Sequence, residues 1–332
     1  MSMSAPARPR PEAGGRQASP EQVLRRLEWT ALRRLDGLLH GDYRSLFRGE
    51  GMDLADLREY QYADDVRHID WNVTARLQVP HVREYHEDRE LAAWFVLDLS
   101  GSVDFGSGTA KKLAVATEFT ALVARALTRL GNRVGAILYG DEVEAVLPPR
   151  SGRSQVLHVM SRMGRRPATG RGAGTDLRKP LRSALQLVRR RSLVFVVSDF
   201  ISAPGWDQPL AQLARRNEVI AVRLIDPLER ALPDLGLVLM QDAETGEQLF
   251  VDTWDAGFRS RFAAAAQARE QTLFDALANA GVDALELATD DDLVATVMRF
   301  VEMRKRSTRR SGAMAAGARS RFGAAAAQER AA

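Results

Sequence analysis

The stretch Ala92–Ser102, AAWFVLDLSGS, decides the fold. Its first half, from Ala92 to Leu97, is a continuous apolar run rich in aromatic and branched side chains, and a turn containing Gly101 follows it. A run of this length predicts a β-strand that is buried on both faces. Such strands are typical of parallel sheets covered by helices, so the stretch favours an α/β domain.

Polar side chains follow this strand directly. Asp98, Ser100 and Ser102 supply one carboxylate and two hydroxyls at the C-terminal end of the strand, where open α/β sheets bind their ligands. Mg²⁺ prefers oxygen ligands in octahedral geometry at about 2.0–2.1 Å. We expect the two hydroxyls to bind such an ion directly and Asp98 to hold it through a coordinated water.

These three residues cannot fill six coordination positions, so further ligands are expected at later strand ends. Thr175 lies just before a predicted helix, and Asp199 follows a second buried strand, Leu193–Ser198. The predicted site, for Mg²⁺ or Mn²⁺, consists of Asp98, Ser100, Ser102, Thr175 and Asp199. The alternative is that these residues only cap turns and helices.

The D-x-S-x-S pattern after an apolar strand, with a later Thr and a later Asp, resembles the metal-ion-dependent adhesion site of von Willebrand factor A domains. A second motif lies upstream and resembles the family called domain of unknown function 58. Its matching residues are Leu57-Arg58-Glu59-Tyr60, Asp64-Asp65, Arg67, Ile69-Asp70-Trp71 and Thr74-Ala75-Arg76. The chain departs from the family at Tyr62-Ala63, where Pro-Gly is frequent.

The upstream motif interleaves acids and arginines with aromatic residues. Because buried charges are tolerated only when paired, we expect an ionic network tying this module to the main domain. Its predicted members are Arg58, Asp64, Asp65, Arg67, Asp70 and Arg76. An ordinary solvated loop is the alternative. The following segment, 80–90, is predicted as solvated charge rather than as a zinc site built on His81 and His86.

Strand and helix signals alternate from residue 91 onward, which predicts a doubly wound, mostly parallel sheet of the von Willebrand factor A-like, Rossmann type. An amphipathic helix is predicted to open at Ser19-Pro20 with a capping box to Gln22 and to dock on the protein itself. The predicted organisation is a disordered segment 1–19, an N-terminal helix and charged loop/β module 20–90, a von Willebrand factor A-like domain 91–303 and a disordered basic tail 304–332.

Composition narrows the function classes. The 332 residues carry a formal net charge of +4 and no cysteine, which excludes disulfides, thiolate metal sites and cysteine nucleophiles. No apolar run is long enough for a membrane span, and residues 1–20 lack the apolar core of a signal peptide. We therefore expect a cytoplasmic protein.

The metal site favours binding over catalysis. No P-loop, hydrolase dyad or serine-centred triad is found, so the chain is not expected to be an enzyme. The family resemblance implies a metal-dependent adaptor that works with a MoxR-type AAA+ ATPase on a client protein, which supplies an Asp or Glu to the metal. The alternatives are a magnesium-dependent phosphohydrolase using Asp98 and a nucleic-acid binder acting through the basic tail, although that tail lacks a folded reader motif.

Overall fold

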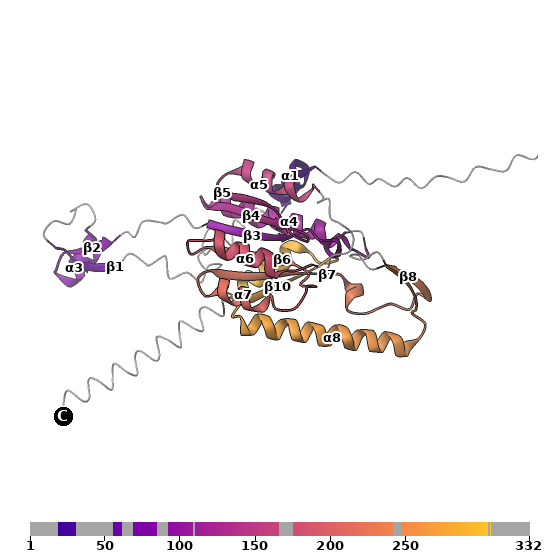
Figure 1. Cartoon of the computed structure of the whole chain (residues 1–332). Coiled ribbons are helices and arrows are strands. Elements are labelled where there is room, and N and C mark those ends of the chain that lie inside the picture. The colour runs from indigo at the N-terminus through magenta and orange to yellow at the C-terminus, as the bar shows by residue number, and fades with distance from the viewer. Residues whose placement is uncertain are drawn as a thin grey trace, which may run out of the picture.

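The structure, a computed structural model, describes residues 19–30, 56–61, 69–84, 92–108, 110–165, 175–241, 247–304 and 306. Its largest feature is a six-stranded sheet in the order β10–β7–β6–β3–β4–β5 (Figure 1). The strands are β3 (Ala92–Asp98), β4 (Arg133–Tyr139), β5 (Val143–Arg150), β6 (Leu193–Ser198), β7 (Glu218–Ile225) and β10 (Asp283–Ala288). Neighbours are parallel except β4 and β5, which form an antiparallel edge. The predicted doubly wound, mostly parallel α/β sheet is confirmed.

The central strand β3 is buried on both faces. Phe95 and Leu97 pack into one hydrophobic core, whereas Trp94 and Val96 pack into the other. Phe95 stacks on Phe195 of β6 with ring centroids 4.9 Å apart. Two separate cores therefore explain why the apolar run of β3 has no polar alternation.

Helices cover both faces of the sheet. The first core receives α1 (Pro20–Thr30), α4 (Lys112–Arg129), α5 (Arg153–Met163) and a helix over residues 293–304. The second receives α6 (Arg178–Leu187), α7 (Asp207–Ala214) and α8 (Ala256–Asn279). None of the helices in the described ranges combines the length and apolar character needed to cross a membrane.

The N-terminal helix α1 begins as the sequence predicts. The Gln22 backbone N–H donates to Ser19 Oγ at 3.3 Å, and the Ser19 N–H donates to Gln22 Oε1 at 2.9 Å, which completes the capping box. Leu24 and Leu27 are buried in the first core, so the helix docks on its own chain as predicted. Val23 packs against the same core and is half-buried.

A small module precedes the main sheet. It consists of β1 (Asp56–Glu59) and β2 (His81–Glu84), which pair antiparallel, with α3 (Trp71–Leu77) between them in the sequence. The segment 80–90, predicted as solvated charge within a loop/β module, contains β2, and its side chains beyond His81 lie outside the described part. A two-stranded ladder of this kind forms by backbone pairing without a continuous apolar pattern in either strand.

The predicted ionic network is only partly visible. Arg76 is exposed, so its predicted burial is wrong, while Asp70 is buried as predicted. The Val73 backbone N–H donates to Asp70 Oδ1 at 3.2 Å, which makes Asp70 the N-cap of α3. The other predicted members, Arg58, Asp64, Asp65 and Arg67, have side chains outside the described part.

The last helix continues past the predicted domain boundary at residue 303. Arg304 is buried, and its guanidinium contacts Glu218 and, at 2.9 Å, Asp283. Those two acids are the first residues of β7 and β10. The assignment of Arg304 to a disordered tail is therefore wrong, because its charge is compensated by two strand ends.

Substitutions of Asp70 distinguish helix capping from ion pairing. Asp70→Ala removes the cap and is expected to lower the free energy of unfolding by about 0.5–2 kcal/mol. Asp70→Asn keeps a capping oxygen and should stay close to the wild type in urea denaturation. Equal losses in the two variants would show instead that the carboxylate charge, and hence the predicted network, is what matters.

Candidate metal centre

The Asp98 carboxylate lies at the end of the central strand and is almost fully buried, with 1% of the residue exposed. Its Oδ1 accepts a hydrogen bond from the Ser100 backbone N–H at 2.9 Å. Its Oδ2 accepts one from Ser198 Oγ at 2.6 Å. Because β3 and β6 are parallel neighbours, the end of β6 places Ser198 beside Asp98. Both carboxylate oxygens are thereby held in fixed orientations.

The two serines of the D-x-S-x-S pattern converge. Ser100 precedes the short 3₁₀ helix Gly101–Asp104, and Ser102 lies within it. Both are buried, and their Oγ atoms are 3.0 Å apart. The tight turn folds the chain back over the strand end and brings together two hydroxyls that an extended chain would hold well apart.

Asp199 follows β6 and is also buried. Its Oδ1 accepts a hydrogen bond from the Ile201 backbone N–H at 3.0 Å. The intervening Phe200 has φ of 59°, a left-handed conformation that costs a non-glycine residue about 1–3 kcal/mol. The Phe200 ring packs against Trp206 at 5.4 Å between centroids, which helps to hold this turn.

Thr175 is tied to the same turn. Its carbonyl oxygen accepts hydrogen bonds from the Ala203 N–H at 3.0 Å and from Ser202 Oγ at 3.1 Å. The Ser202 oxygen in turn accepts the Leu177 N–H, next to the start of α6. The structure thus attaches the Thr175 loop to the segment that follows Asp199, with Thr175 itself only 3% exposed.

Lys112 was not predicted as part of the site. Its ammonium is buried and lies 2.7 Å from Asp199 Oδ2 and 2.6 Å from Glu229 Oε1. Burial lowers the pKa of Lys112, but the two carboxylates outweigh it and the pKa is raised overall. The side chain therefore stays charged and neutralises one of the two acids that it joins.

The Asp98 carboxyl behaves differently because none of the cationic side chains in the described ranges contacts it. Burial, reinforced by the nearby negative charge of Asp199, raises the pKa of Asp98 from 3.8 to about 6. Tyr139 lies opposite Asp98 in β4, and burial together with the Asp98 charge raises the pKa of its phenol as well. The Tyr139 hydroxyl finds no hydrogen-bond partner among the described residues.

The side chains at this end of the sheet fit a hard divalent cation. The described residues contain no cluster of three or more His, Asp or Glu side chains suited to a metal, so hydroxyls have to supply the other donors. Two hydroxyls 3.0 Å apart beside a buried carboxylate are oxygen donors of the kind that a hard cation prefers.

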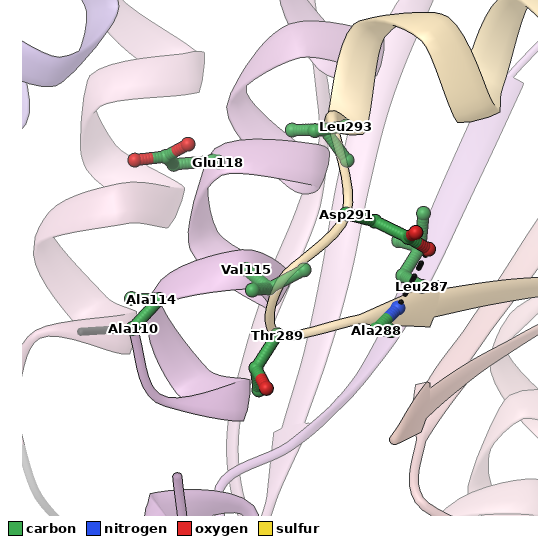
Figure 2. A pocket seen from close by; sticks show the side chains of 9 residues that line it. All are labelled: Ala110, Ala114, Val115, Glu118, Leu287, Ala288, Thr289, Asp291 and Leu293. Atoms are coloured by element: carbon green, nitrogen blue, oxygen red, sulfur yellow. Dashed lines mark hydrogen bonds between the residues drawn. The ribbon is translucent and has the colours of Figure 1, made fainter. Parts of the chain in front are cut away.

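A separate pocket offers no better site. It has a volume of about 100 Å³ and lies between α4 and the end of β10, with Glu118, Thr289 and Asp291 among its lining residues (Figure 2). The Asp291 carboxylate accepts the Ala288 N–H at 3.1 Å and so serves its own turn. Small-molecule sites usually measure roughly 300–1,000 Å³, so this pocket is too small for a typical ligand.

Known proteins resemble the chain at two levels. Solved structures include BatB from Bacteroides thetaiotaomicron, 13% identical with a TM-score of 0.42 over 65% of this chain and 99% of that one. Another is a von Willebrand factor type A protein from Catenulispora acidiphila, 13% identical with a TM-score of 0.34 over 69% of this chain and 44% of that one.

Sequence relatives are much nearer. Uncharacterized proteins of Mycobacterium tuberculosis and Mycobacterium bovis are 38% identical over 287 residues, which is 86% of this chain and 89% of theirs. Residues 56–272 match the family described as "Protein of unknown function DUF58", and this range includes both the charged module and the candidate site. The chain belongs to the DUF58 family.

Proposed function

We propose that this protein is a metal-dependent adaptor that binds an acidic residue of a client protein through Mg²⁺ or Mn²⁺ and works with a MoxR-type AAA+ ATPase. The metal would be held by Ser100, Ser102 and Thr175 directly, and by Asp98 and Asp199 through water. We place this activity in the cytoplasm, a reducing compartment, because the chain contains no cysteine.

The separation of the two serine oxygens carries the proposal. Adjacent ligands of an octahedral Mg²⁺ at 2.0–2.1 Å are about 2.9 Å apart. Ser100 Oγ and Ser102 Oγ are 3.0 Å apart, the spacing that two neighbouring ligands require. A hydroxyl–hydroxyl hydrogen bond has a similar length, so the metal-binding test below is needed to separate the two interpretations.

The charge balance also supports a divalent ion. Asp98, Asp199 and Glu229 carry three negative charges when ionised, and the Lys112 ammonium offsets one of them. The negative charge that remains favours a divalent ion and would act on it through water rather than by direct ligation. A monovalent ion would leave buried negative charge uncompensated, which is unfavourable at a site with little exposure.

The donor set favours binding over catalysis. Neutral hydroxyls as direct ligands leave the ion most of its positive charge, which a carboxylate from another protein neutralises. A phosphohydrolase of the aspartyl-phosphate type would need an acid two residues after Asp98, where the chain has Ser100. The MoxR-type partner rests on the family resemblance alone, and the ATPase supplies the energy source that this chain lacks.

Metal binding can be tested by thermal stability. Mg²⁺ at about 100 times its Kd should raise the free energy of unfolding of the wild type by about 2.7 kcal/mol. Asp98→Asn and Ser100→Ala should abolish this increase. The matched control is Asp104→Asn, six residues from Asp98, because the Asp104 carboxylate pairs with Lys111 at 3.1 Å. An unchanged metal response in Asp98→Asn and Ser100→Ala would refute the site.

The metal-free protein should show a characteristic pH dependence. Asp98 holds its proton more tightly in the folded state, where its pKa is about 6, than in the unfolded state, where a carboxyl has its ordinary pKa of 3.8. Between these values the folded state binds more protons, so its stability falls as the pH rises and levels off above about 6. The fall attributable to Asp98 is at most about 3 kcal/mol. Denaturation in EDTA from pH 4 to 7 should show it, and Asp98→Asn should remove it.

Partner binding separates an adaptor from an enzyme. We expect a complex with a MoxR-type AAA+ ATPase and its client to weaken in EDTA and in Thr175→Ala, but not in the control Thr117→Ala on the α4 surface. Deleting residues 307–332 should leave it intact, and this deletion spares Arg304. Magnesium-dependent phosphate-ester hydrolysis that Asp98→Asn abolishes would overturn the proposal, as would binding that survives EDTA but is lost with the tail.

A further inference from the structure

The hairpin of β8 (Leu237–Gln241) and β9 (Gln248–Asp252) carries an unusual concentration of exposed apolar side chains. Seven of the fifteen large apolar residues that are exposed in the described ranges lie between residues 235 and 254. They are Leu235, Leu237, Leu239, Met240, Leu249, Phe250 and Trp254, with exposures of 37% to 71%. Clustered apolar exposure of this kind marks an interaction site, whereas scattered exposed side chains do not.

The strand register places these residues on both faces of the hairpin. Leu239 lies opposite Phe250, and Leu237 shares that face, while Met240 lies opposite Leu249 on the other. The hairpin forms its own two-stranded sheet, separate from the central one. A sheet of two strands is marginally stable by itself, so it gains from being covered.

The base of the hairpin is nevertheless firmly joined to the protein. Thr253 is buried, its hydroxyl donates to the Gly236 carbonyl at 2.7 Å, and the same oxygen accepts the Leu235 N–H at 2.9 Å. The Arg259 guanidinium bonds the carbonyl oxygens of Thr253 and Trp254. The apolar side chains are therefore presented from an anchored base.

Charge identifies the kind of occupant. Between Arg230 and Arg259 the chain has six acidic residues and no Lys or Arg, although the whole protein is net basic. The acids are Asp234, Asp242, Glu244, Glu247, Asp252 and Asp255. Ion pairs of Arg259 with Asp234 and of Arg261 with Asp255 offset two of these charges. The apolar cluster thus lies within an acidic segment, which complements a basic surface.

Four other occupants fit less well. An anionic membrane or nucleic acid would be repelled by the acidic residues. A second copy in a two-fold contact would bring like charges together. The basic tail follows Arg304 in the sequence, and Arg304 contacts the first residues of β7 and β10, whereas the hairpin follows the opposite end of β7 (Figure 1).

We propose that the β8–β9 hairpin is a docking surface for a separate protein that presents apolar side chains flanked by Lys or Arg. Its apolar residues would take up the partner's apolar side chains, and its acids would pair with the flanking cations. Within the described ranges each strand of the hairpin pairs on one edge only, so a partner strand can add to the other. This surface does not depend on the metal.

The probe is a fluorescent twelve-residue peptide of alternating Leu and Lys, compared with one of alternating Leu and Glu by fluorescence anisotropy in EDTA. The full chain should bind the Leu/Lys peptide at least tenfold more tightly, and salt should weaken that binding. Leu239→Ser and Phe250→Ser should each weaken it at least tenfold. Asp252→Asn, which keeps the oxygen that accepts the Trp254 N–H but removes the charge, should reduce both the affinity and its salt dependence.

The control is Leu187→Ser, since Leu187 is 40% exposed at the end of α6 that precedes β6. It should leave the affinity unchanged, and melting curves should show that all variants fold. Hydrogen exchange should show peptide-dependent protection confined to residues 235–254. Because EDTA is present throughout, failure here leaves the metal proposal intact, and the reverse also holds.

Several results would overturn the inference. These are equal affinity for the two peptides, binding that survives Leu239→Ser and Phe250→Ser, or protection elsewhere in the chain. A wild-type dimer that Phe250→Ser converts to a monomer would show that a second copy covers the hairpin. A tenfold gain in peptide affinity on deleting residues 307–332 would show that the chain's own tail does so.

Discussion

Two carboxylates buried side by side impose the main constraint on this structure. Asp98 ends the central strand and Asp199 follows its parallel neighbour, so the sheet brings like charges together where little water reaches them. Uncompensated, that arrangement would destabilise the fold by several kcal/mol. The other groups at this end of the sheet supply either hydrogen bonds or positive charge to these two acids.

The negative charges of Asp98 and Asp199 are compensated in different ways. Asp199 has a permanent cation, since Lys112 contacts it at 2.7 Å, even though a positive charge at the first residue of α4 is opposed by the helix dipole. Among the described residues Asp98 receives neutral donors, from Ser100 and Ser198. Burial and the Asp199 charge raise its pKa, and a divalent ion at the serine hydroxyls would lower it.

Much of this arrangement follows from local sequence. The apolar run of β3 predicts a doubly buried strand, and parallel pairing then predicts that Asp98 and Asp199 meet at one edge. Lys112 was not predicted as part of the site. A signal was present, since Lys112 precedes the buried Ala116 and Phe119 at helical spacing, and a lysine on that stripe requires an acidic partner.

Other features could not be predicted because they depend on contacts between distant segments. Nothing near Glu229 in the sequence indicates that it shares a lysine with Asp199. Arg304 was assigned to the tail because its partners Glu218 and Asp283 are distant in the sequence and meet it only in the folded protein. The exposure of the hairpin β8–β9 could not be predicted either, because an apolar strand pair is as consistent with a core as with a binding surface.

A hydrogen-bonded turn at Asp226 links the candidate site to the hairpin. Asp226 is fully buried, and its carboxylate accepts hydrogen bonds from Ser107, Thr289 and Leu228. The Asp226 backbone N–H donates to Glu229, whose other oxygen accepts from Lys112. The chain then runs from this capping box directly toward β8.

This shared support bears on how a partner would be bound. The turn that positions Lys112 beside Asp199 is also the turn from which the hairpin segment departs. Surfaces mounted on one hydrogen-bonded support lose little conformational freedom when a partner contacts both of them, so more of the contact energy appears as affinity. The buried Asp226 carboxylate therefore holds both the candidate site and the start of the hairpin segment in place, so a partner that contacted both would have less freedom to restrict.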